Sequence, residues 1–303
     1  MFILAAFTRL PVPVQATLLM SAAMVFFTSM GVFIRLSSQN LHVLEVVFFR
    51  NFLAVLLMVP WIMGHGVSAL KTDKYGLYGL RAAINLTAMA AGFAAITMIP
   101  LAEATALGFT APLFATIGAV LVLGEVIRVR RVAALAAGFL GMLLVLRPGL
   151  ESLSLGALLA LGNALGFSIT ALVVKKLTAT ERPEAIVLWM VLLQSPFSLI
   201  PALFVWTWPD PMTWLWLFCL AGAGTAGHVC WTRACGLAEI TQLQPLEFIK
   251  LPLIGVMGFL LFGEEPTVWI WLGGAVIFCS TAYISHREAV LARRSARERK
   301  NGG

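Results

Sequence analysis

Charged residues are scarce in this sequence. Only 12% of its 303 residues are Asp, Glu, Lys or Arg, whereas a soluble domain carries about 25%. The hydrophobic fraction is 60% and the mean hydropathy is +0.93. Water cannot be the solvent for most of such a surface, so the composition excludes an ordinary soluble protein and leaves no soluble domain of useful size.

Cysteine, histidine and aspartate are few and scattered. The four Cys all fall in or beside apolar segments of the second half, and their spacing fits neither a zinc site nor a disulfide framework. We interpret them as small core residues. The sequence contains no His-Glu-x-x-His, no Gly-x-Ser-x-Gly and no phosphate-binding Gly-Lys-Ser/Thr. We therefore predict no catalytic residues, no metal, no cofactor and no ATP hydrolysis.

Long apolar runs fill most of the chain. A helix needs about 20 mostly apolar residues to cross the hydrocarbon core, and the first run is too long for a signal-peptide core and lacks a cleavage site. Short connections around Pro or Gly imply antiparallel neighbours. We predict ten spans, over residues 14–36, 43–63, 77–98, 101–123, 131–147, 153–175, 185–207, 212–233, 238–262 and 267–285.

Lys and Arg predict the orientation, because cytoplasmic loops retain positive charge. Of the 21 basic residues, seventeen fall on the side that holds both termini, two on the other side and two inside spans. Both termini are therefore expected in the cytoplasm, which agrees with an even number of spans. The basic tail, 286–303, could bind lipid headgroups or nucleic acid. We favour a solvated topology anchor, with the lipid bilayer and no nucleic acid as partner.

The chain contains a weak internal repeat at an offset of 136 to 140 residues. Four matches occur in the same order, and each pairs a feature of the first half with one of the second. They are Phe27 and Arg35 with Phe167 and Lys175, Glu45 with Glu184, 101–105 with 237–241, and 123–125 with 262–264. Five spans per half is an odd number, so the second half enters the membrane from the opposite side. Alternating-access transporters commonly use such an inverted repeat.

Each half closes its fourth span with a Gly-Glu pair, at residues 124–125 and 263–264, and continues into a Gly-rich fifth span. In this pattern the chain resembles the EamA type of the drug/metabolite transporter superfamily, over about residues 14 to 285. The resemblance implies an all-α integral membrane protein with a five-helix repeat over 1–148, a second over 149–285 and the tail over 286–303. It also implies a central cavity lined by spans one, three, four, six, eight and nine, in a bacterial-type inner-membrane carrier of small metabolites.

Span nine holds the strongest candidates for a binding site. Glu247 and Lys250 lie three apart on one helical face near the expected midplane, and ionisable groups at that depth usually face a cavity or a partner. Pro245 and Pro252 should kink this helix. Gln244 lies in the same segment and is a further candidate for substrate binding. The alternative for the charged pair is an internal salt bridge that only fixes packing.

Spans three and eight add weaker candidates. His228 could line the cavity and couple transport to protons, and Trp231 could stack on a planar substrate, although Trp also belongs at membrane interfaces. Asn85 is expected in the cavity. Arg81 lies one turn from it and could bind a carboxylate, but we favour an arginine that extends to the cytoplasmic headgroups. Asn163 in span six is expected to bond between helices.

Span two carries Glu45 and Arg50, which are five apart and do not share a helical face well. Arg50 is deep enough to need a partner. Because the resemblance places span two outside the cavity, we predict a structural or gating bridge for this pair. The two Gly-Glu pairs lie at span ends, where capping or gating of loops is the expected role.

These features predict a secondary active transporter for a small organic metabolite, working by alternating access. The resemblance favours export of an amino-acid-like metabolite, with uptake of a vitamin or nucleoside-like compound as the alternative. A membrane enzyme or accessory protein is a remote alternative. A channel would need polar rings along a continuous pore, whereas the polar groups in these spans are sparse. A coupled proton or counter-substrate is an open partner, and both a monomer and a homodimer fit the sequence.

Overall fold

The computed structural model describes residues 10–66, 71–111, 113–114, 117, 129–146, 154–238, 243, 246–247, 249–280 and 282–283. Within these ranges the regular secondary structure is helical. The helices are α2 (Val12–Ser37), α3 (Val43–His65), α4 (Tyr75–Met98), α5 (Leu101–Gly108), α7 (Val129–Leu146), α8 (Leu155–Leu177), α9 (Pro183–Ala202), a 3-10 turn η2 (Leu203–Val205), α10 (Pro211–Leu237), α12 (Lys250–Phe262) and a last helix, Val268–Ser280.

Each of the ten predicted spans includes described helical residues, and spans four and nine have the most residues outside the described ranges. In the described part of the chain, five helices are both long and apolar enough to cross a membrane: α2, α3, α4, α8, and α9 with its 3-10 extension. The 27 residues of α10 also exceed the roughly 30 Å of a hydrocarbon core at about 1.5 Å per residue.

Several helices begin at residues suited to a helix start. Pro183 opens α9 and Pro211 opens α10, where the missing N–H would have no intrahelical acceptor. Asp210 caps α10 by accepting a hydrogen bond from the backbone N–H of Thr213 at 3.0 Å. Hydrogen bonding with Thr213 lowers the pKa of this exposed carboxyl. These residues fix where α9 and α10 begin, so that the connections before them stay short and each helix packs against its neighbour.

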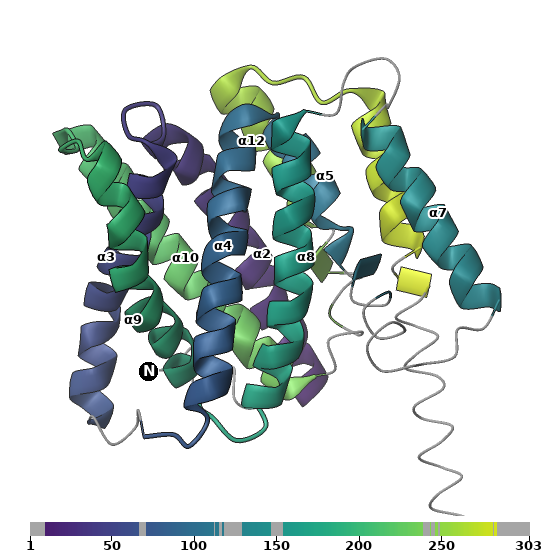
Figure 1. Cartoon of the computed structure of the whole chain (residues 1–303). Coiled ribbons are helices and arrows are strands. Elements are labelled where there is room, and N and C mark those ends of the chain that lie inside the picture. The colour runs from purple at the N-terminus through teal and green to yellow at the C-terminus, as the bar shows by residue number, and fades with distance from the viewer. Residues whose placement is uncertain are drawn as a thin grey trace, which may run out of the picture.

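The helices pack in pairs that the internal repeat makes equivalent. Spans one and eight lie along each other as α2 and α10, and spans six and three do so as α8 and α4. Spans two and seven, α3 and α9, form one side of the molecule, and α7 with the last helix forms the other (Figure 1). Exchange of the two repeats turns each pair into its counterpart. The packing therefore has the pseudo-two-fold relation that an inverted repeat predicts.

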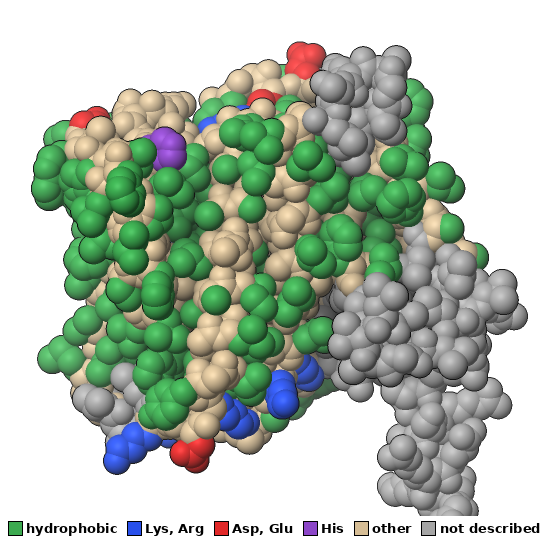
Figure 2. All heavy atoms as spheres, viewed as in Figure 1, with side chains coloured by type: hydrophobic (Ala, Val, Ile, Leu, Met, Phe, Trp, Pro, Cys, Tyr) green, Lys and Arg blue, Asp and Glu red, His purple; other side chains and the backbone are tan. Residues whose placement is uncertain are grey.

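The outer surface suits a lipid environment. Large apolar side chains such as Leu56, Leu172, Phe197 and Leu260 are exposed, and hydrophobic side chains cover the viewed face over most of its height (Figure 2). Most Lys and Arg side chains in this view lie at its lower edge. Exposed apolar area of this extent is unfavourable in water and favourable against acyl chains.

Spans four and nine are both interrupted. In span four, α5 ends at Gly108 and a turn at 109–110 precedes the next helical residues. In span nine, Ile249 lies in a turn and α12 begins at Lys250. Pro252 lies in the first turn of α12, directly after this interruption, so span nine is discontinuous as its prolines predict. Pro245 lies outside the described residues. The break therefore falls beside the charged pair.

One predicted repeat match is out of register. The sequence pairs Leu101 with Leu237 as the openings of spans four and nine. In the structure Leu101 opens α5, whereas Leu237 is the last residue of α10. Similar letters at two helix junctions produced this match, because apolar helices share few residue types.

Candidate functional site

A central cavity of about 200 Å³ lies between helices of both repeats. Its walls come from α2, α4, α5, α8, α10 and α12 together with Glu247. These belong to the six spans that the family resemblance predicts for the cavity. One wall residue, Arg50, comes from α3, which was expected outside it. Phe27, Phe93 and Phe167 supply aromatic surface, and Asn85 and Asn163 supply amide groups.

The structure places Glu247 and Lys250 together at the cavity wall. A Glu247 carboxylate oxygen lies 3.9 Å from the Lys250 ammonium, which is an ion pair but too long for a direct hydrogen bond. The Lys250 ammonium also lies 5.9 Å from the centre of the Phe109 ring, within the range of a cation–π contact. The pair is partly exposed, at 19% and 25% for the two side chains. Both predicted features, cavity lining and a mutual ion pair, are present, and substrate contact stays a prediction.

His228 and Asn85 line the same cavity. The His228 ring packs edge-on against Phe27 with centroids 5.1 Å apart, and its buried Nδ1 has no hydrogen-bond partner. Asn85 accepts a hydrogen bond from the Gln194 amide at 2.9 Å. Gln194 is fully buried in α9 and also donates to the carbonyl of Ala82. The sequence analysis missed Gln194, although a lone Gln in an apolar span is a signal of this kind of contact.

Arg81 and Trp231 lie outside the cavity. Arg81 is 1% exposed and donates from Nη1 to the backbone carbonyl of Ile186 at 2.7 Å. The prediction that Arg81 extends to the cytoplasmic headgroups is therefore wrong, because the first turn of α9 offers a carbonyl acceptor nearby. Trp231 is buried against Phe167, whose ring lines the cavity. Gln244 lies outside the described residues.

Glu45 and Arg50 do not form the predicted bridge with each other. Glu45 accepts from the backbone N–H of His42 at 3.0 Å, which completes a capping box for α3, and from the N–H of Thr207. Arg50 donates from Nη1 to Asn51 at 2.9 Å. Both side chains are fully buried, but the Glu45 carboxylate is bound at the N-terminus of α3, about one and a half turns from Arg50. Glu45 is a structural cap.

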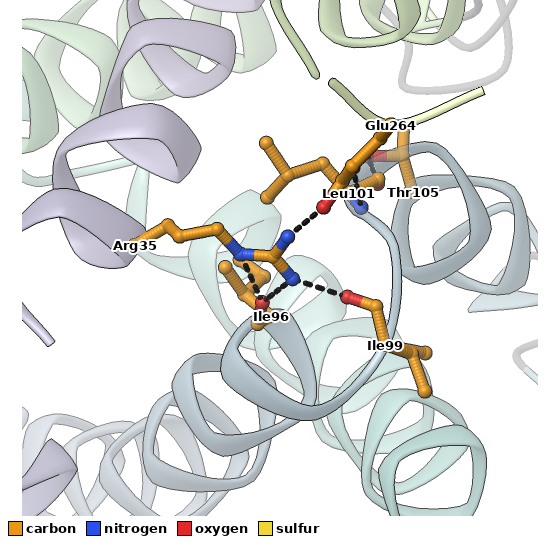
Figure 3. Close-up of polar contacts among 6 residues, drawn as sticks. All are labelled: Arg35, Ile96, Ile99, Leu101, Thr105 and Glu264. Carbon is orange, nitrogen blue, oxygen red and sulfur yellow. Dashed lines mark hydrogen bonds and ion pairs between the residues drawn. The ribbon is translucent and has the colours of Figure 1, made fainter. Parts of the chain in front are cut away.

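A polar cluster at the C-terminal end of α2 joins the two repeats (Figure 3). The guanidinium of Arg35 forms an ion pair with Glu264 and donates to the carbonyls of Ile96 and Ile99 at the end of α4. Glu264 also accepts from the backbone N–H of Leu101 at 2.8 Å, which caps α5. We call these five residues the Arg35 clamp. It ties α2 and the α4–α5 junction to the segment after α12.

Glycines place Glu264 in this clamp. Gly263 ends α12 with φ of 66° and ψ of 21°, a left-handed conformation that favours glycine. A Cβ atom at Gly258 would lie 3.0 Å from the Glu264 carboxylate. Both Gly-Glu pairs were expected to cap or gate loops. Glu264 does cap α5, and the pair at 124–125 lies outside the described residues. The ion pair between Arg35 and Glu264 could not be predicted from local sequence, because the two residues are 229 positions apart.

The second repeat contains a counterpart of this cluster. Lys175, the sequence match of Arg35, donates to the carbonyls of Cys235 at 2.7 Å and Ala238 at 2.9 Å. These two residues lie 139 positions after the two whose carbonyls Arg35 binds. A basic residue at the end of spans one and six therefore holds the end of spans three and eight in the same way. The carbonyl contacts of the clamp therefore recur in the second repeat.

Comparison with known proteins is consistent with this architecture. The EamA-like transporter family matches residues 15–147 and again residues 154–286. The chain belongs to the EamA-like transporter family. An EamA-like protein of this kind is a membrane transporter. A crystal structure of another protein shares the fold, with a TM-score of 0.64 at 18% identity over 92% of this chain and 98% of that one.

Several curated relatives match most of this EamA-like chain. A riboflavin transporter of Vibrio cholerae is 34% identical over 80% of this chain and 82% of its own length. An S-adenosylmethionine uptake transporter of Rickettsia prowazekii is 26% identical over 82% and 85%. A pseudopaline exporter of Pseudomonas aeruginosa is 26% identical over 86% and 92%. The family therefore includes proteins named for uptake and for export.

Proposed function

We propose that this protein is a secondary active transporter that takes up a vitamin or nucleoside-like metabolite across the cytoplasmic membrane by alternating access. The observation that carries the proposal is the central cavity, which both repeats build and which combines aromatic rings, amides and ionisable groups. Flat heteroaromatic compounds with polar substituents suit such walls, because rings stack on Phe and base edges bond to amides. The named specificities of the riboflavin and S-adenosylmethionine relatives support this class over the amino-acid-like cargo that the sequence favours.

The mechanism follows from the repeat. The two halves rock about the cavity, so that a substrate at Glu247 and Lys250 meets first one side of the membrane and then the other. The Arg35 clamp closes one end of the helix bundle, and the Lys175 contacts close the opposite end. The excess of Lys and Arg supports the assignment of the Arg35 end to the outer side, with both termini in the cytoplasm.

Flux into proteoliposomes of purified protein tests the proposal. Riboflavin and S-adenosylmethionine are supplied as radiolabelled substrates, and leucine serves as an amino acid with no heteroaromatic ring. We expect saturable uptake of at least one of the first two and none of leucine. Uptake of leucine alone would contradict the vitamin or nucleoside-like class, and no flux of any compound tested would contradict the proposed function.

Variants of the charged pair test the site. Glu247→Gln and Lys250→Ala are expected to reduce flux at least tenfold, because each leaves the other charge unpaired in the cavity wall. Glu265→Gln removes an exposed carboxylate outside the cavity and should transport like the parent chain. Full transport by both cavity variants, at normal yield and folding, would remove the pair from the site.

A further inference from the structure

Arg50 is an uncompensated cation at the cavity wall. Its side chain is 0% exposed and lines the cavity from α3. Only Nη1 has an acceptor, the side-chain oxygen of Asn51 at 2.9 Å, whereas Nε and Nη2 have none and are sealed from water. Among the described residues, no carboxylate forms an ion pair with it. The guanidinium therefore lacks a counter-charge, and two of its three nitrogens lack a hydrogen-bond acceptor.

The unpaired atoms form one edge of the guanidinium. Nε and Nη2 are the two nitrogens that bind a carboxylate or phosphate through parallel hydrogen bonds. A Cβ atom at Gly224 of α10 would lie 3.1 Å from Nε and 3.2 Å from Nη2, so the α10 backbone passes close to this edge at a glycine and supplies no acceptor to it. A buried cation without a partner is unfavourable. An anionic acceptor in the cavity would relieve that penalty.

The other charges of the cavity do not supply this acceptor. Glu247 is paired with Lys250, so that pair is neutral. His228, the remaining ionisable group of the wall, has an unpartnered Nδ1 of its own and no negative charge. The cavity walls thus carry one net positive charge at Arg50.

We propose that Arg50 binds an anionic carboxylate or phosphate of the transported metabolite and sets a preference for anionic substrates. This inference rests on the proposed function for the nature of the cargo, and it makes Arg50 a specificity residue, not the structural bridge that the sequence suggested. The aromatic and amide walls contact the ring system of the substrate, and Arg50 favours those substrates that carry an anionic group.

Thermal shift of the purified protein in a non-ionic detergent tests this, because no lipid phosphate then competes. The probes are riboflavin and riboflavin 5′-phosphate, which share one ring system and differ in the phosphate, and inorganic phosphate alone. We expect the phosphorylated flavin to bind at least tenfold more tightly than riboflavin, and inorganic phosphate to stabilise the protein saturably. Equal binding of the two flavins, or no effect of inorganic phosphate, would overturn the proposal.

Three variants assign the preference to Arg50. Arg50→Gln should remove it, so that both flavins bind equally and inorganic phosphate has no effect. Arg50→Lys keeps the positive charge and should retain part of the preference, which distinguishes loss of the charge from loss of the fold. Arg81→Gln removes an equally buried guanidinium that lies outside the cavity and should retain the parent preference. An unchanged preference in Arg50→Gln, or its loss in Arg81→Gln alone, would contradict the assignment.

The outcomes separate this inference from the proposed function. Stabilisation by inorganic phosphate that depends on Arg50, with no flux of any metabolite, supports the anion site and contradicts the proposed cargo. Flux of riboflavin together with indifference to charge supports the transporter and removes Arg50 from the site.

Discussion

At the scale of single residues, the clamp depends on one carboxylate that serves two partners. Glu264 neutralises Arg35 and caps α5 at Leu101, with side-chain exposures of only 14% for Glu264 and 18% for Arg35. Ion pairs in such an environment lose little to solvent screening, unlike exposed ones. The same residue therefore stabilises the fold and holds the two repeats together.

Glu264→Gln should lower the stability of the purified protein by about 1–3 kcal/mol, because Arg35 keeps its carbonyl contacts and loses its counter-charge. The measurement is the melting temperature in detergent. Glu265→Gln, a change of the neighbouring exposed carboxylate, should leave it unaltered. Equal melting temperatures for the two variants would show that the clamp contributes nothing to stability.

The sequence alone could predict some of these residues and not others. Glu247, Lys250, His228 and Asn85 line the cavity as expected, because a polar group within an apolar span must face protein or water. Arg50 satisfies the same rule, yet the family resemblance argued against it. The contacts of Arg81 with Ile186 could not be predicted, since they depend on how two helices distant in sequence cross.

At the scale of helices, the two fifth spans meet through glycine. A Cβ at Gly141 of α7 would lie 2.9 Å from the carbonyl oxygen of Gly273, and one at Gly273 would lie 2.6 Å from that of Gly141. The Gly-rich composition of these spans is visible in the sequence, and small residues commonly allow helices to approach closely in membranes. Their mutual contact is not visible there, because composition does not say which helix is the partner.

Gly141→Ala should destabilise the protein by about 1–3 kcal/mol, since the added methyl group meets backbone that cannot move aside without separating the helices. Gly222→Ala is the matched control, because nothing lies within 4 Å of a Cβ at that helical position. The control should be neutral or slightly stabilising through higher helix propensity. The measurement is the melting temperature of each variant in detergent. Equal melting temperatures for the two variants would contradict the prediction.

At the scale of the whole molecule, the fold is the part that sequence predicts best. Span lengths follow from the thickness of a bilayer, and the repeat follows from features that recur once per half. The interruptions of spans four and nine are harder to place, because the turn at Ile249 depends on packing as well as on nearby prolines. The equivalence of Arg35 and Lys175 was visible as a letter match, but its meaning needed the carbonyls that each one binds.

That equivalence predicts opposite effects at the two ends of the transporter. If the Arg35 clamp closes one end and Lys175 the other, Glu264→Gln should favour the state open at the Arg35 end, and Lys175→Gln the state open at the opposite end. A shift of about 1.4 kcal/mol in this balance changes the ratio of the states tenfold, so the effect should be several-fold and measurable.

The measurement uses a single cysteine at Ala104, a partly buried residue of the cavity wall, in a chain whose four native cysteines are replaced. A charged thiol reagent is added to right-side-out or to inside-out vesicles. Glu264→Gln should accelerate labelling from the face where Arg35 lies, and Lys175→Gln from the other face, because each variant weakens one closure and leaves its counterpart intact.

Arg233→Gln breaks a surface ion pair with Glu184, in which Arg233 is 51% exposed, and should change neither rate, since exposed pairs contribute little. Acceleration from the same face in both variants would show that the two clusters do not act as opposed closures, and the pseudo-two-fold relation would then describe the fold without describing the transport cycle.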